Sequence, residues 1–182
     1  MLKNSARAPL ETPEQVTLPD STVLTLRPIR PEDAPRLQAF HTRLSDESIF
    51  FRFLGHPRIL SDEQAYALSN VDYQNTMALV AMVPTPNDVR LVGVARYELI
   101  PGVQPKRAEA AIIVEDSAQR FGLGAILSDR LVAYARRQGI QTFVAVIDPE
   151  NVAVLRLLNH RGLPFQVVGH DAEATEIRID IS

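Results

Sequence analysis

The residues with the clearest chemical potential lie in one stretch, 108–127, which reads AEAAIIVEDSAQRFGLGAIL. It runs from an apolar strand through a polar hinge into a turn that carries Gly122 and Gly124 and opens a helix. A helix N-terminus offers unpaired N–H groups and partial positive charge, so it attracts anions. Glycine lets a ligand approach the backbone closely at such a turn. The spacing therefore predicts either a phosphate-binding turn or a strand–helix turn without a ligand, and the residues alone leave both interpretations open.

These glycines do not match the common nucleotide motifs. No Gly-Lys-Ser/Thr follows them, which excludes a Walker A motif, and Leu127 stands where G-x-G-x-x-G requires its third glycine. Glu115 and Asp116 come just before the turn. Because negative charge there would oppose an anion, we expect these two carboxylates to be solvated hinge residues.

Glu109, near the start of the same stretch, is a candidate general base. Strand alternation predicts that Glu109, Ala111 and Ile113 share one face. A carboxylate can accept a proton from a reacting group directly or through water. The alternative is an exposed carboxylate at a strand end, which the residues alone favour.

Composition excludes several other kinds of site. The chain has no cysteine, which excludes disulfides, thiolate zinc sites and a cysteine nucleophile. Its four histidines show no metal-ligand spacing, so no metal is expected. The formal net charge of -3 gives no electrostatic reason to bind nucleic acid or an anionic membrane. With neither a signal-peptide core nor a long apolar run, we expect a cytoplasmic enzyme or binding domain.

Hydrophobic patterning predicts the elements that position these residues. Residues 1–20 are expected to form a flexible lead-in, and residues 21–182 one domain. Strands are expected at 22–29, 76–83, 89–99, 107–115, 141–147, 165–168 and 175–181, and helices at 31–44, 45–55, 61–70, 122–139 and 148–162. In the second helix, Ile49, Phe50 and Phe53 are expected to form the buried side. This order predicts a mixed sheet with helices packed on it.

Three separated stretches resemble one protein family. The segment QRFGLG at 119–124, with a strand before it and a helix after it, resembles the acyl-CoA-binding motif of GNAT superfamily N-acetyltransferases. The stretches LRPIRPEDAPRL, RLSDESIFFRFLG and RAEAAIIVEDSAQRFGLG are similar, in order, to signatures of bacterial Pat-type protein-lysine acetyltransferases. The resemblance covers about residues 22–181. It implies a single GNAT-like α/β (α+β) domain with a mixed, mostly antiparallel central sheet and helices on both faces.

The resemblance also implies the roles of individual residues. Glu109 would be the general base. Backbone groups of 112–114 would pair with pantetheine like an added strand, and one of these amides would face the thioester carbonyl. Backbone amides of 120–125 would hold the pyrophosphate of acetyl-CoA, with Gln119 shaping the turn and Asn151 near the pantetheine arm. The implied cofactor contacts are Ile112, Ile113, Val114, Gln119, Arg120, Phe121, Gly122, Leu123, Gly124, Ala125 and Asn151.

The implied function is transfer of an acetyl group from acetyl-CoA to a primary amine by direct attack, since no cysteine is available as a carrier. A protein lysine is the implied acceptor, with a small-molecule amine as its rival. Leu158 stands where many superfamily members carry a tyrosine acid, so no tyrosine is expected to protonate the thiolate at that position. A catalytically silent acyl-CoA-binding sensor module is the second hypothesis. A homodimer is compatible with the resemblance, and neither a nucleic acid nor a membrane is an expected partner.

Overall fold

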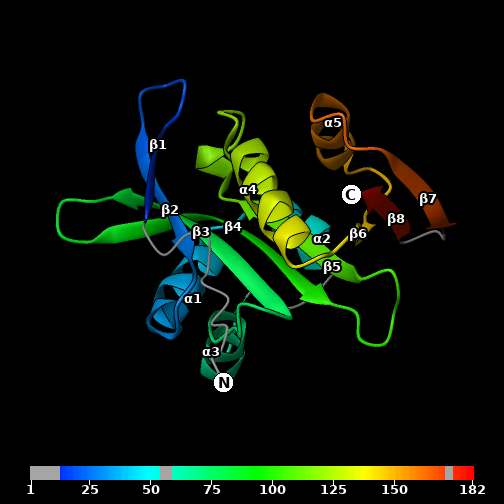
Figure 1. The fold of residues 1–182 in the computed structure, drawn as a ribbon. Helices are drawn as coiled ribbons and strands as arrows, with labels where there is room; N and C mark the ends of the chain where they lie inside the picture. The colour runs from blue at the N-terminus through cyan, green and yellow to red at the C-terminus, as the bar shows by residue number, and fades with distance from the viewer. Residues whose placement is uncertain (1–12, 54–58, 171–173) are drawn as a thin grey trace, which may run out of the picture.

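The computed structural model describes residues 13–53, 59–170 and 174–182 (Figure 1). The strands are β1 (Glu14–Thr17), β2 (Val23–Pro28), β3 (Thr76–Pro84), β4 (Val89–Leu99), β5 (Arg107–Val114), β6 (Thr142–Ile147), β7 (Phe165–His170) and β8 (Thr175–Asp180). The α-helices are α1 (Ala34–Thr42), α2 (Asp46–Phe53), α3 (Asp62–Ser69), α4 (Leu123–Arg137) and α5 (Val152–His160). Two short 3-10 helices are η1 (Pro31–Asp33) and η2 (Asp116–Ala118).

The strands form one eight-stranded sheet in the order β1-β2-β3-β4-β5-β6-β8-β7. Every neighbouring pair is antiparallel except β5 and β6, which run parallel. Helix α4 covers one face of the sheet, and α1 and α3 cover the other (Figure 1). The predicted mixed, mostly antiparallel sheet with helices on both faces is therefore confirmed.

Strand β3 shows why the sequence carries a continuous apolar run there. Met77 and Leu79 pack into the cluster that contains α4, whereas Ala78 and Val80 pack into the cluster that contains α1. Successive side chains of a strand point to opposite faces, so a central strand between two helical layers must be apolar at every position. None of the helices among the described residues has the length and apolar character needed to cross a bilayer.

The N-terminal segment differs from the expected lead-in. Residues Glu14–Thr17 form strand β1, which pairs antiparallel with β2 at the edge of the sheet. Arg130 of α4 binds the Glu14 carboxylate through two nitrogens, at 2.5 and 2.8 Å. A flexible lead-in is therefore wrong for 14–17, because a partner 116 residues away holds this strand. Residues 1–12 lie outside the described residues.

Helix α2 presents a different side from the one expected. Ile49 is buried, as predicted, but the Phe50 side chain is 48% exposed. Phe51 instead lines the cavities described below. Two adjacent helical residues point about 100° apart, so Phe50 and Phe51 cannot both face the same layer.

Candidate active site

The sheet opens where β5 and β6 diverge. Their parallel register covers three pairs and ends at Glu109↔Val144. Strand β5 continues to Val114 and β6 to Ile147. On the side of β6, the backbone of residues 110–114 therefore faces an opening in the sheet instead of a neighbouring strand.

Hydrogen bonds at both ends of β5 fix which of its residues face this opening. The N–H of Ile100 donates to the carbonyl of Arg107 at 2.9 Å, and the N–H of Glu115 donates to the carbonyl of Val92 at 2.8 Å. Hydrogen-bonded positions alternate along an antiparallel pair. Odd-numbered residues of β5 therefore bond to β4, and even-numbered residues turn their N–H and C=O groups toward the opening.

This alternation separates the three expected pantetheine contacts. Ile112 and Val114 present backbone groups to the opening, and Gln119 Nε2 already donates to the Val114 carbonyl at 3.0 Å. All three residues line the second cavity described below, but the backbone groups of Ile113 are directed to β4. The backbone groups of Ile112 and Val114 are therefore free of β4 and could pair with pantetheine as expected. Those of Ile113 face β4 and could not.

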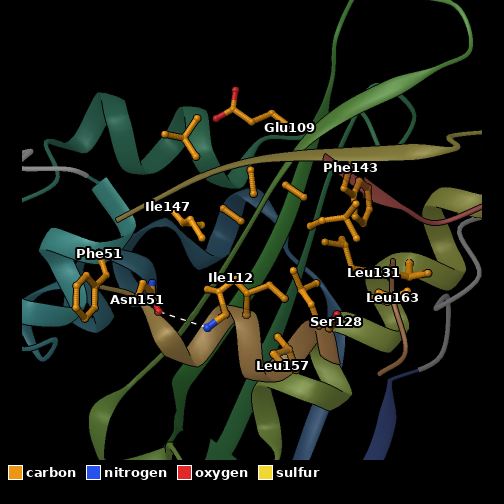
Figure 2. Close-up of a pocket in the computed structure, with 18 residues that line it drawn as sticks. Phe51, Glu109, Ile112, Ser128, Leu131, Phe143, Ile147, Asn151, Leu157 and Leu163 are labelled. Carbon is orange, nitrogen blue, oxygen red and sulfur yellow. Dashed lines mark hydrogen bonds between the residues drawn. The ribbon is translucent and has the colours of Figure 1, made fainter. Parts of the chain in front are cut away.

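A first cavity of about 500 Å³ occupies the opening (Figure 2). Its walls come from β5, β6, α4 and α5, with Phe51 of α2, and they are mostly apolar. Among its described lining residues, Glu109 is the single ionisable side chain, and Ser128 and Asn151 are uncharged polar ones. Glu109 is exposed, and Figure 2 shows its carboxylate projecting outward from the ring of apolar side chains. The cavity thus combines a mostly apolar interior with one carboxylate at its rim.

A second cavity, of about 840 Å³, adjoins the first and shares the walls formed by Phe51, Ile112 and Asn151. Five residues of the predicted phosphate turn line it: Gln119, Arg120, Gly122, Gly124 and Ala125. Phe121 and Leu123 are not among its lining residues. The Phe121 side chain is 37% exposed, and the Leu123 side chain is buried in the core.

The turn has the geometry that an anion site requires. Gly122 is the residue before the first turn of α4 and has a left-handed φ of 83°. A Cβ built on Gly122 would meet no protein atom within 4 Å, so the space beside it is open. The 15-residue helix α4 begins at this point, and its first N–H groups have no partner within the helix. The turn therefore has room for an anion, which is one of the two interpretations that the sequence left open.

Asn151 lies between the two cavities at the start of α5. Its Oδ1 accepts a hydrogen bond from the N–H of Val154 at 3.4 Å, which caps the helix (Figure 2). The cap leaves the Asn151 side-chain amide N–H groups available to a ligand. Asn151 thus lines both cavities, and its place beside the pantetheine arm stays a prediction.

Leu158 is buried in α5 and lines the first cavity. Its aliphatic side chain has no proton to donate to a thiolate. None of the described residues that line this cavity is a tyrosine. Tyr134, the tyrosine of α4, is buried and donates its hydroxyl proton to the carbonyl of Tyr73 at 2.5 Å.

Asp116 is exposed, as expected of a solvated residue, but it is also a structural anchor. Its carboxylate accepts hydrogen bonds from the Ser45 N–H at 2.9 Å, the Ser45 hydroxyl at 2.6 Å and the Ser48 hydroxyl at 3.0 Å. Gln119 Nε2 also donates to the Ser48 hydroxyl at 3.2 Å. Burial raises the pKa of Asp116, but the Ser45 and Ser48 hydrogen bonds outweigh it and hold the pKa below its usual value. The phosphate turn and helix α2 are thereby joined.

Glu115 differs from expectation, because it is 4% exposed. Arg43 Nε lies 3.0 Å from its carboxylate, and an Arg90 nitrogen lies 3.6 Å away. The Ser117 hydroxyl donates to the same carboxylate at 2.9 Å. A buried carboxylate is tolerated when such partners compensate its charge. Glu115 therefore fixes the end of β5 instead of repelling an anion.

We expect the Asp116→Ala variant to lower the free energy of unfolding by about 1 kcal/mol, because an exposed charged acceptor of several hydrogen bonds is lost. The lowered pKa of Asp116 means that its contribution is present at neutral pH and disappears as pH falls through the acidic range. Urea unfolding of both proteins at neutral and acidic pH would measure this. Glu63→Ala on α3, which removes an exposed carboxylate elsewhere, is the control. Equal stability of the Asp116 variant and wild type at neutral pH would contradict the anchoring role.

Phe51 is the site residue that sequence reasoning missed. It lines both cavities from α2, a helix that the sequence pattern predicts, but on a side that the pattern did not predict to be buried. The sequence does contain an indication of this. Phe50 and Phe51 are adjacent, so only one of them can lie in the apolar stripe of the helix that faces the core.

Comparison with known proteins agrees with this geometry. A family model described as Acetyltransferase (GNAT) domain matches residues 23–163. An acetyltransferase of Pseudomonas aeruginosa is 35% identical over 153 residues, covering 84% of this chain and 81% of that protein. The acetyltransferase Pat of Mycolicibacterium smegmatis is 28% identical over 155 residues, covering 83% of this chain and 44% of Pat. The chain thus spans less than half the length of that relative.

Solved structures show the same fold. The GNAT domain of S. lividans PAT superposes with a TM-score of 0.83 at 26% identity, covering 96% of this chain and 99% of that domain. The yncA structure from Salmonella typhimurium, solved with its cofactor acetyl-CoA, has a TM-score of 0.68 at 20% identity, covering 87% and 94%. The residues that the family model matches, 23–163, include the diverging strands β5 and β6 and the glycine turn. The chain belongs to the GNAT family and is an acetyltransferase.

Proposed function

We propose that this chain transfers the acetyl group of acetyl-CoA to a lysine side chain of a protein, with Glu109 as the general base. The observation that carries the proposal is the first cavity, whose described lining includes Glu109 as its single ionisable side chain. An apolar cavity excludes water from the thioester, and a carboxylate at its exposed rim can meet an incoming ammonium group.

The chain would take the proton from the amine at the rim and stabilise charge on the thioester deeper in the cavity. Glu109 and Ile112 are three residues apart along β5, about 10 Å in an extended strand. The Ile112 N–H faces the opening and is the proposed donor to the carbonyl oxygen as negative charge develops on it. At that separation, we propose that the proton reaches the Glu109 carboxylate through water. The thiolate leaves and takes a proton from water, since Leu158 offers none.

The phosphate end of the cosubstrate is proposed to lie in the second cavity. Backbone N–H groups of the turn 120–125 and the N-terminus of α4 would hold the pyrophosphate, and Gln119 would keep the turn in place through its bond to Val114. Asn151 and the even-numbered backbone groups of β5 would then hold the pantetheine arm between the two cavities.

A protein lysine is proposed as the acceptor because the chain resembles Pat-type protein-lysine acetyltransferases and because Glu109 is reachable from solvent. The lysine side chain carries a long apolar stem, which suits an apolar opening with a carboxylate at its rim. A small-molecule amine remains the rival acceptor, since the same rim would admit it.

A direct test compares acceptors in one assay. The purified protein is given acetyl-CoA with lysine peptides, folded proteins from a lysate and a panel of small amines, and CoA release is measured with acetyl-lysine detection by mass spectrometry. We expect acetyl-lysine on proteins and faster CoA release with lysine peptides than with small amines. Turnover confined to small amines would overturn the acceptor assignment. Tight acetyl-CoA binding with no turnover on any acceptor would instead support a silent sensor module.

A further inference from the structure

Arg96 of β4 carries a positive charge close to the first cavity. It pairs with Ala111 of β5 in the sheet register, and Glu109 lies two residues before Ala111 on the same face. Diagonal neighbours of this kind, such as Arg96 and Glu109, are about 7–8 Å apart. Ala111 lines the first cavity and also a third, small cavity of about 40 Å³, which Arg96 lines as well. Arg96 and the first cavity therefore adjoin the same small residue.

The Arg96 guanidinium lies in a weakly polar setting. The side chain is half-buried, and among the residues that the structure describes it makes neither a hydrogen bond nor an ion pair. The walls that α1 and α3 contribute to the third cavity are apolar apart from the buried His41 of α1. Burial lowers the pKa of Arg96, against the attraction of Glu98 and Glu109, but a guanidinium in a protein stays protonated. Arg96 is therefore a permanent cation.

The charged groups near Arg96 are ordered along the two strands. Glu98 lies opposite Glu109, at the rim of the first cavity, and both are exposed. Arg107 lies on the same face two residues before Glu109, and therefore farther out. Arg96 lies two residues further in, level with Ala111. An amine that moves from the rim toward the thioester therefore passes from carboxylates toward a guanidinium.

We propose that Arg96 promotes acetyl transfer by favouring the neutral form of the acceptor amine at the inner end of its path. This inference rests on the proposed function, in which the amine meets Glu109 at the rim and attacks the thioester beside Ile112. A positive charge nearby disfavours an ammonium ion and so lowers the pKa of the amine. One N–H bond of the ammonium breaks and the proton passes through water to the Glu109 carboxylate. The lone pair left on the nitrogen then attacks the thioester carbon.

The size of the effect follows from the distance and from the basicity of lysine. At about 8 Å, with the screening typical of a protein surface, one charge shifts the pKa of a neighbouring group by about one unit. A lysine with a pKa of ~10.4 is almost wholly protonated at neutral pH, so each unit by which this pKa rises lowers the neutral fraction about 10-fold. Loss of the guanidinium should therefore lower kcat, while the ammonium form should bind better without the repulsion.

The Arg96→Gln variant, assayed with a lysine peptide at saturating acetyl-CoA, tests this. We expect kcat at neutral pH to fall about 10-fold, the midpoint of its rise with pH to move up by about one unit, and KM for the peptide to fall. Arg96→Lys keeps the charge and should retain the wild-type profile. Arg107→Gln removes an arginine from the same face, four residues and about 13 Å from Ala111, and as the matched control should leave kcat and KM near wild-type values.

The direction of the KM change separates an electrostatic role from a structural one. A lower kcat with a higher KM in Arg96→Gln would overturn the inference, because a damaged site loses affinity for the amine. Unchanged kcat and KM, or an equal loss in Arg96→Lys or Arg107→Gln, would overturn it as well. A wild type that turns over neither lysine peptides nor small amines would instead contradict the proposed function on which the inference rests.

Discussion

The Glu109→Gln variant is expected to lower kcat for amine acetylation by about 10²–10⁴-fold, the range for losing a general base. Glutamine keeps the size and polarity of the side chain but cannot accept a proton from the ammonium group. The dissociation constant for acetyl-CoA should not change, because the side chain of Glu109 does not line the second cavity. Steady-state rates at saturating acetyl-CoA, together with calorimetric binding, measure the two quantities separately.

Glu98 provides a matched control for this variant. It lies directly opposite Glu109 in the β4–β5 register, so the two side chains share one face of the sheet, and both are exposed. Glu98→Gln removes the same charge one strand away and is expected to leave kcat within a few fold of wild type. Undiminished turnover by Glu109→Gln would remove Glu109 as the base. An equal loss in both variants would show that the net charge of this face matters, and not a specific proton acceptor.

The second large effect is expected for Gly122→Asp, which should weaken acetyl-CoA binding by about 100-fold or more. The substituted side chain enters open space at the start of α4, where the pyrophosphate is proposed to lie, and brings a negative charge. Two unit charges 4 Å apart near a protein surface repel by about 4 kcal/mol. The left-handed φ of 83° strains any substituted residue, but aspartate tolerates this region better than most, so the fold should survive.

Gly139 supplies the control for backbone strain. It has a φ of 75°, close to the 83° of Gly122, and a Cβ there would also meet nothing within 4 Å. Gly139→Asp places the same residue in a similar conformation at the opposite end of α4, and its acetyl-CoA affinity should match wild type. Gly122→Asn adds the bulk without the charge and should fall between the two. Unchanged affinity in Gly122→Asp would mean that the pyrophosphate lies elsewhere.

Much of the fold followed from local sequence patterns. The glycine turn and the stripe of Leu123, Leu127 and Leu131 placed α4, because helix starts and apolar periodicity depend on neighbouring residues. The Ser61–Gln64 capping box likewise placed the start of α3. These signals act within a few residues of chain, so the sequence displays them directly.

The rest depended on contacts between distant segments. Glu115 and Asp116 look solvated in sequence because their partners Arg43 and Ser45 lie 72 and 71 residues away. Strand β1 was hidden for the same reason, since its stability depends on pairing with β2 and on Arg130. The direction of backbone groups along β5 required the register with β4, which no single strand reveals.

The gap between β5 and β6 has a consequence for where binding energy arises. The Val114 carbonyl already accepts a hydrogen bond from Gln119, and at the other backbone groups that face the gap a ligand amide would replace water, which exchanges one hydrogen bond for another. Each exchange contributes only about 0.5–1.5 kcal/mol, and it is available at every second residue of a short strand. The backbone of β5 is therefore suited to fixing the depth at which the thioester binds in the apolar cavity. Most of the binding free energy must then come from the phosphate turn and from water released by the apolar walls. Affinity and the positioning of the thioester therefore depend on different parts of this site.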